Sequence, residues 1–100
     1  IPLVCVQDTK VPVPPSAKLV VYEPIFAIGS GNPDTPDNAD SVAQTLLQKN
    51  PNLEVLYGGS VTEENAKAFL QQDNISGLLI GGTSLDPEKF LKIVELSYNI

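Results

Sequence analysis

The chain contains no histidine and no arginine, and it has a single cysteine among its 100 residues. Without histidine, and with Cys5 as the only thiol, these residues offer neither histidine-based catalysis nor a credible zinc site. Cys5 cannot form an internal disulfide, which favours a reducing compartment, and we expect a cytoplasmic protein. No apolar run approaches the roughly 20 residues that a membrane-spanning helix needs, so we expect no membrane partner.

Positive charge is also scarce, since six lysines stand against 12 acidic residues and the net charge is -6. The sequence has no basic stripe, which argues against nucleic acid as a partner. An acidic chain binds an anionic ligand through local donors, such as backbone N–H groups at helix N-termini. The composition, 42% hydrophobic and 18% charged, is that of a globular protein, and the length fits one domain over residues 1–100 without linkers.

Short apolar runs alternate with longer amphipathic segments. Helices are predicted after the N-cap residues Thr35, Thr62 and Asp86. Buried strands are predicted at residues 3–6, 19–22, 53–57 and 77–80, with Cys5 packed as a small apolar group. This order predicts an α/β fold with a parallel sheet covered by helices. An open doubly wound sheet and part of a (βα)8 barrel both fit it. The link 7–18 is too short for a full helix.

Glu23 directly follows the predicted strand LVVY, at the edge of the sheet where α/β folds place their active sites. A carboxylate that is half removed from solvent is a good proton acceptor near neutral pH. A solvated loop acid is the ordinary interpretation of a lone glutamate at a strand end, and the position alone does not exclude it.

The next segment, residues 24–34 (PIFAIGSGNPD), is a long glycine-containing loop. Its middle is apolar, and Pro24 and Pro33 stiffen its ends. Such a loop can swing as one body and exclude water when it closes. An ordinary connector, whose glycines serve only turn geometry, explains the same pattern.

Two diglycine turns follow consecutive strands, at residues 58–60 (GGS) and 81–84 (GGTS). Glycine lets a backbone approach an anion closely, and Ser60 adds a hydroxyl donor. Many (βα)8 barrels bind phosphate in the loops after their last two strands. The pair therefore indicates a phosphorylated ligand.

Together, the segments YEPIFAIGSG, LYGGSV and LLIGGTSL resemble the C-terminal signature segments of the triosephosphate isomerase family, in the same order and spacing. The resemblance runs from Tyr22 to the last helix. It implies the C-terminal half of a (βα)8 TIM barrel and an isomerase of glycolysis and gluconeogenesis. This enzyme would interconvert dihydroxyacetone phosphate and glyceraldehyde 3-phosphate without a cofactor or metal. Its full-length form would be a cytoplasmic homodimer.

The resemblance also implies roles for particular residues. Glu23 would be the catalytic base. The substrate phosphate would be bound by Gly29, Ser60, Gly81 and Gly82. The lid and the apolar clamp over the base would comprise Pro24, Ile28, Tyr57 and Leu79, with Tyr57 hydrogen-bonding the closed lid.

The sequence departs from the family pattern in three places. Phe26 stands where the family usually has tryptophan, residues 32–34 (NPD) replace a basic hinge, and the link 7–18 is shorter than the family's helix. The family's histidine, lysine and asparagine belong to a first half of the barrel that this sequence lacks. We therefore expect residues of a longer chain, with at most trace activity in isolation.

Two other functions remain open on the sequence. Another phosphate-binding barrel enzyme would share the diglycine turns, although it would lack the carboxylate before the AIGSG loop. A non-catalytic half-barrel that dimerises through its open sheet edges would bind no phosphorylated ligand.

Overall fold

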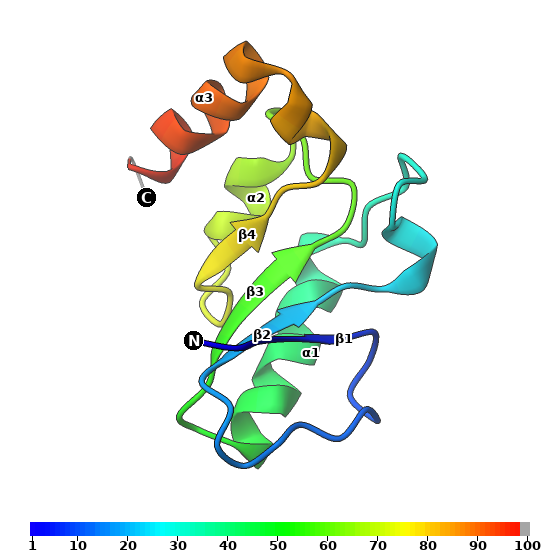
Figure 1. Ribbon diagram of the computed structural model, residues 1–100, viewed down its shortest axis with the longest axis vertical. Coiled ribbons are helices and arrows are strands. Elements are labelled where there is room, and N and C mark those ends of the chain that lie inside the picture. The colour runs from blue at the N-terminus through cyan, green and yellow to red at the C-terminus, as the bar shows by residue number, and fades with distance from the viewer. Residues whose placement is uncertain (99–100) are drawn as a thin grey trace.

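The computed structural model describes residues 1–98. Four strands and three helices follow one another along the chain, with two short 3-10 helices, η1 and η2, after β2 and β4 (Figure 1). In chain order, the elements are β1 (Leu3–Val6), β2 (Leu19–Tyr22), η1 (Ile25–Ala27), α1 (Pro36–Lys49), β3 (Glu54–Gly58), α2 (Ala66–Leu70), β4 (Gly77–Leu79), η2 (Gly82–Leu85) and α3 (Pro87–Ser97).

The strands form one parallel sheet in the order β1-β2-β3-β4. Val6 of β1 lies beside Tyr22 of β2, which lies beside Tyr57 of β3, so the carboxyl ends of the strands meet at one edge. The predicted α/β fold with a parallel sheet is confirmed. The predicted bounds of β1 and β2 agree with the structure, whereas β3 begins one residue later and β4 ends one residue earlier than predicted.

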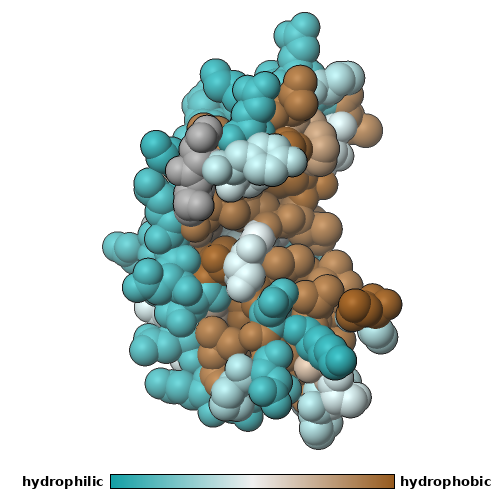
Figure 2. Space-filling model, turned by 90° about the vertical axis from the view of Figure 1, so that its left-hand side faces the viewer, coloured by the Kyte–Doolittle hydropathy of each residue, from teal (hydrophilic) through white to brown (hydrophobic). Residues whose placement is uncertain are grey.

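Alternate side chains of the strands face opposite sides of the sheet. One side packs under the helices and carries the hydrophobic core, to which Val6, Val20, Tyr22, Val55 and Tyr57 contribute. The side chains of the intervening strand residues face the other side of the sheet. Figure 2 shows apolar residues gathered along one side of the molecule and polar residues along the opposite side.

Helix α1 packs on β2 and β3, α2 packs on β4, and α3 packs on α2, so the helices cover one face of the sheet. Two predicted N-caps are confirmed. Thr35 Oγ1 accepts a hydrogen bond from the amide of Asn38, and the carboxylate of Asp86 accepts from the amides of Glu88 and Lys89. These caps satisfy amides that have no partner within the first helical turn.

The predicted start of α2 at Thr62 is wrong. Thr62 Oγ1 accepts from the amide of Asn65 at 3.3 Å, but it caps a turn, and regular helix begins only at Ala66. Asn65 fixes that turn, because its Oδ1 accepts from the Thr62 amide and its Nδ2 donates to the Ser60 carbonyl. The side chain of Asn65 thus competes with helical bonding at this point.

The prediction of four buried strands also needs correction. Leu3 and Cys5 of β1 are exposed, and so is Leu79 of β4, because these strands form the two edges of the sheet. Val21 of the inner strand β2 lies beside Cys5 on the same face and is fully buried, so the exposure belongs to the edge strands. Cys5 therefore does not pack as a buried apolar group.

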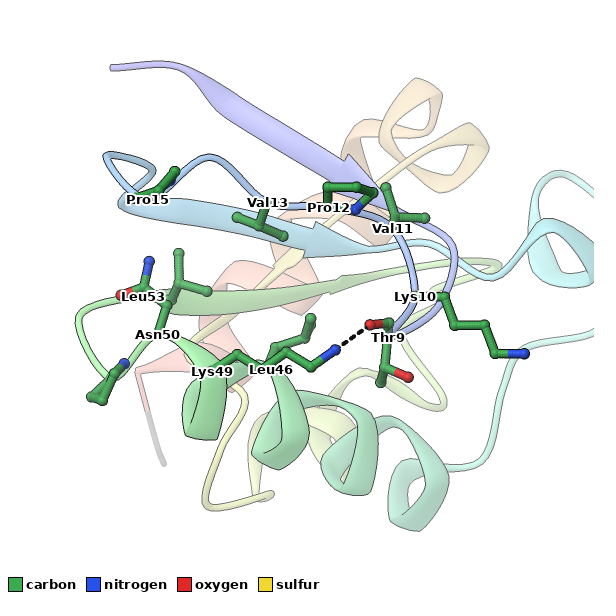
Figure 3. A pocket seen from close by; sticks show the side chains of 11 residues that line it. Thr9, Lys10, Val11, Pro12, Val13, Pro15, Leu46, Lys49, Asn50 and Leu53 are labelled. Atoms are coloured by element: carbon green, nitrogen blue, oxygen red, sulfur yellow. Dashed lines mark hydrogen bonds between the residues drawn. The ribbon is translucent and has the colours of Figure 1, made fainter.

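The link 7–18 contains no helix, as predicted. It passes over the end of α1, where Lys49 Nζ donates to the Thr9 carbonyl at 2.6 Å. A cavity of about 360 Å³ lies between the link and α1, with Val11, Val13 and Leu46 in its wall (Figure 3). None of the predicted site residues lines it.

Candidate active site

Glu23 lies at the carboxyl end of β2, and its amide donates to the Val6 carbonyl at 2.8 Å. Because Tyr22 faces the helices, the next side chain turns to the opposite face of the sheet. There the Glu23 carboxylate lies against Gly58, where an added Cβ would stand 3.1 Å from Oε2. A glycine at position 58 leaves the room that this carboxylate occupies. Glu23 is partly buried beside the first diglycine turn.

The loop 24–34 leaves β2 through the buried Pro24 and forms η1, whose first turn is closed by the Ala27 amide donating to the Pro24 carbonyl at 2.9 Å. Gly29 and Gly31 both have positive φ, at 62° and 77°. Residues with a Cβ rarely adopt this conformation, which accounts for the two glycines in the loop tip.

Ser60 joins the tip of the loop to the first diglycine turn. Its hydroxyl donates to the Ala27 carbonyl at 2.6 Å and accepts from the Gly31 amide at 3.1 Å. The predicted phosphate donor therefore has its hydroxyl engaged with the loop. Ser60 has a φ of 52°, a conformation that costs free energy in a residue with a side chain and that the two loop contacts help to hold.

Tyr57 is fully buried and joins the same turn to the far end of the loop. Its hydroxyl donates to the Gly59 carbonyl at 2.8 Å and accepts from the Asp34 amide at 2.9 Å. Its ring stacks on Phe69, with the ring centroids 4.0 Å apart. Burial, as the largest cause, raises the pKa of Tyr57 above its usual value. The hydroxyl consequently stays protonated and able to donate at neutral pH.

One cavity of about 670 Å³ brings most of the predicted residues together. It lies at the carboxyl ends of β2, β3 and β4, between the loop and the two diglycine turns. Pro24 and Tyr57 do not line it. The predicted residues that line it are Glu23, Ile28, Gly29, Ser60, Leu79, Gly81 and Gly82.

Backbone amides of the glycines are candidate donors for an anion in this cavity. Among the described residues that line it, none is cationic, and Glu23 and Glu64 are acidic. Gly81 and Gly82 leave open space where a Cβ would stand, so a ligand can approach their backbone closely. The short helix η2 begins at Gly82, and the first amides of a helix have no intrahelical acceptor. Such a helix start favours an anion.

The apolar pair predicted to clamp the base comes from the loop and from β4. Ile28 is 55% exposed and Leu79 is 36% exposed. Both line the same cavity as Glu23. Their role as a clamp stays a prediction.

Cys5 is a neighbour of the candidate base that the sequence alone did not reveal. Although Cys5 is exposed, partial desolvation of its thiol, the negative charge of Glu23 and a hydrogen bond with the Glu23 side chain all raise the pKa of the thiol. The register of β1 and β2 could have predicted this proximity, because Val6 pairs with Tyr22 and so places Cys5 and Glu23 on the same face.

Three polar residues that shape the site were also missed. Thr83 donates from its hydroxyl to the Val61 carbonyl at 2.8 Å and ties η2 to the first diglycine turn. Asn65 holds the Ser60 carbonyl, and Asp34 holds the end of the loop. Their partners are distant in sequence or in irregular turns, so no spacing pattern marked them. Among residues 1–98, no group of His, Cys, Asp or Glu side chains could hold a metal ion.

Comparisons with a family pattern and with individual proteins identify the same family. The triosephosphate isomerase family pattern matches residues 2–97. The triosephosphate isomerase of Mesomycoplasma hyorhinis is 46% identical over 83 residues, which cover 82% of this chain and 34% of that protein. The Aquifex aeolicus enzyme is 48% identical over 83 residues, covering 75% of this chain and 34% of its own length.

The chain spans about a third of the length of these curated relatives. Within the part of the chain that the structure describes, no helix combines the length and the hydropathy needed to cross a membrane. The four parallel strands, each followed at its carboxyl end by a link, loop or turn, agree with part of a TIM barrel. On its sequence and its fold, this chain belongs to the triosephosphate isomerase family.

Proposed function

We propose that the full-length protein carrying this chain interconverts dihydroxyacetone phosphate and glyceraldehyde 3-phosphate. The observation that carries the proposal is the position of Glu23, which shares one cavity with the loop tip and with both diglycine turns. A phosphate held at these turns would place the triose carbons toward the base. Holding both groups in one cavity makes the proton transfer effectively intramolecular.

The reaction needs one group that removes and returns a proton. The Glu23 carboxylate takes a proton from the carbon beside the carbonyl, and the electron pair of that bond moves to form an enediolate. The hydroxyl proton of the enediolate passes from one oxygen to the other, a transfer that the expected groups outside these residues would carry out. The resulting carboxylic acid then returns the proton to the adjacent carbon, and the carbonyl forms at the oxygen that lost its proton. No bond to the phosphate breaks, and the carboxylate is regenerated.

The phosphate would be held by main-chain amides, because the cavity offers no cationic side chain among the described residues. Gly29, Gly81 and Gly82 leave their backbones open, and the start of η2 adds amides without helical partners. Because its hydroxyl already bonds the loop, Ser60 would contribute its own amide. These donors orient the substrate without a metal or cofactor.

The loop would act as a lid over the reacting carbons. A closed lid excludes water and strengthens the electrostatic interactions inside. It also keeps the enediolate phosphate away from solvent, where it would eliminate phosphate. Ile28 and Leu79 line the cavity, and they would cover the carboxylate when substrate is present.

Other parts of the activity would come from outside these residues. A histidine, a lysine and an asparagine that stabilise the developing oxyanion are expected on the remaining part of the barrel. We also propose that the full-length protein is a cytoplasmic homodimer that acts in glycolysis and gluconeogenesis. A half-barrel that only binds a partner would need neither the open backbone at Gly81 and Gly82 nor the carboxylate beside Gly58.

Substitution of Glu23 by Gln in the full-length protein tests the proposal. The amide keeps the shape of the side chain but accepts no proton, so we expect the turnover number to fall about 1000-fold or more. Triose phosphate interconversion is measured by a coupled assay, and circular dichroism reports the fold. Glu54→Gln, at the opposite end of β3, is the matched control. An unchanged turnover number in Glu23→Gln would remove the base assignment.

A further inference from the structure

We propose that Asp34 is a positioning residue that anchors the C-terminal end of the loop 24–34 while the rest of the loop moves. Among residues 1–98, it is the only charged residue that is buried, at 8% exposed. Its importance for catalysis rests on the proposed function, but its anchoring of the loop does not. The evidence is a set of hydrogen bonds that joins three elements at this one residue.

The carboxylate of Asp34 accepts three hydrogen bonds. The hydroxyl of Tyr22 donates to Oδ2 at 2.7 Å, and Asn38 Nδ2 donates to the same oxygen at 2.8 Å. The Thr35 amide donates to Oδ1 at 2.8 Å. A buried carboxylate is tolerated when its oxygens are bonded in this way, and bonds to a charged acceptor are stronger than neutral ones. The donors come from β2 and from the start of α1, which are rigid parts of the fold.

The backbone of Asp34 completes the anchor on its other side. Its amide donates to the Tyr57 hydroxyl, which in turn donates to the Gly59 carbonyl. One residue is thus linked to β2 one position before Glu23, to α1, and to the first diglycine turn. An end of the loop that is fixed to all three holds a constant position relative to the base and to the phosphate site.

The tip of the loop is attached much more lightly. The Ser60 hydroxyl links the tip to the rest of the fold through its hydrogen bonds with Ala27 and Gly31, and residues 28–33 are exposed. Opening the loop breaks these two contacts at little cost, whereas moving Asp34 would leave the Tyr22 hydroxyl and the Asn38 amide without their acceptor. Motion therefore ends at Asn32 and Pro33, between the glycine-rich tip and the anchor.

Hydrogen exchange of the full-length protein tests the anchor independently of its activity. In Asp34→Ala and Tyr22→Phe, we expect amide exchange to become faster at residues 25–34 than in the wild type. This increase should be at least threefold larger than the increase at residues 42–49 of α1. Asp34→Asn, which keeps an acceptor for the Tyr22 hydroxyl, should retain most of the protection. Asp37→Ala, an exposed acid in the first turn of α1, is the matched control and should leave the loop unchanged.

Steady-state kinetics provides a second measurement. The KM and kcat of the folded protein would not change if Asp34 only stabilised the fold. If Asp34 positions the loop, Asp34→Ala raises the KM for triose phosphate and lowers kcat in the folded protein, while Asp34→Asn restores most of both. Wild-type loop protection in both Asp34→Ala and Tyr22→Phe would overturn the anchor. Should Asp34→Ala fail to fold, Tyr22→Phe alone decides, because it removes only one hydroxyl. An inactive wild type would refute the proposed function and leave the exchange result to decide on the anchor.

Discussion

The Cys5 thiol and the Glu23 carboxylate are hydrogen-bonded neighbours, and the charge of Glu23 affects the pKa of the thiol. Partial burial, the Glu23 charge and the hydrogen bond between the two side chains all favour the protonated thiol. A thiol with a raised pKa presents less thiolate at a given pH, and the thiolate is the reactive species. Cys5 therefore reports on the charge state of the candidate base.

This coupling predicts a pH-dependent change in thiol reactivity. In Glu23→Gln, the negative charge that raises the pKa of Cys5 is gone, so the pKa falls and alkylation between pH 7 and 9 speeds up severalfold. Well above the thiol pKa the two rates converge, because both thiols are then ionised. Peptide-resolved mass spectrometry with iodoacetamide measures the rate, with Glu54→Gln as control. Equal rates in Glu23→Gln and the wild type across this range would refute the coupling.

At the residue scale, the sequence predicted the side chains that follow strands and missed those that act through distant partners. Glu23, Gly81 and Gly82 were predictable because parallel strands end at one edge of the sheet. Asp34 was read only as the end of a loop, since its bonds to Tyr22 and Asn38 depend on how the loop folds back over α1. The hydrogen bond from the Ser60 hydroxyl to the Ala27 carbonyl could not be predicted from the sequence for the same reason.

At the element scale, the first diglycine turn is packed tightly against the loop. Gly59 has a φ of 148°, and a Cβ there would stand 2.8 Å from Ala27 Cβ and 2.9 Å from the Tyr57 hydroxyl. The second turn is open, since an added Cβ at Gly82 meets no atom within 4 Å. The two turns look alike in sequence but differ in their surroundings. The first positions the loop, and the second leaves room for a ligand.

This contrast predicts different costs for the same substitution. Gly59→Ala should lower the free energy of unfolding by about 2 kcal/mol, because it combines backbone strain with a close contact. Gly82→Ala should change it by about 0.5 kcal/mol or less. Urea denaturation of the two variants and the wild type measures both values. Equal stability of Gly59→Ala and the wild type would mean that the turn is not packed against the loop.

Elements with strong local signals were predicted well. The caps at Thr35 and Asp86 and the strands β1 and β2 were located correctly because cap residues and apolar runs act locally. The start of α2 was misplaced because the Asn65 side chain fixes the preceding turn. Sequence periodicity does not distinguish a side chain that caps a helix from one that caps a turn.

At the scale of the whole molecule, the sheet is open at both edges. The structure exposes 6088 Å², whereas a monomeric protein of 10.7 kDa typically exposes about 5,500 Å². The excess agrees with the apolar side in Figure 2 and with the exposed residues of β1 and β4. Burial of these strands was overpredicted because an apolar run does not reveal whether its neighbours in the sheet are present.

The open edges predict how residues 1–100 behave when produced alone. Unpaired strand edges and an uncovered apolar face promote self-association, so we expect oligomers in sedimentation analysis at micromolar concentration. Without groups that stabilise the oxyanion, turnover should be roughly 1000-fold or more below that of the full-length protein. A monomer with the full turnover number would contradict this account of the isolated chain.

The central claim is that the Glu23 carboxylate carries the transferred proton, and isotope exchange tests it directly. The full-length protein is incubated with dihydroxyacetone phosphate in deuterium oxide, and the triose phosphates are examined by proton magnetic resonance. We predict deuterium on the carbon that receives the returned proton in the wild type and in Glu54→Gln, and no incorporation above background in Glu23→Gln. Deuterium incorporation at the wild-type rate in folded Glu23→Gln would contradict the account.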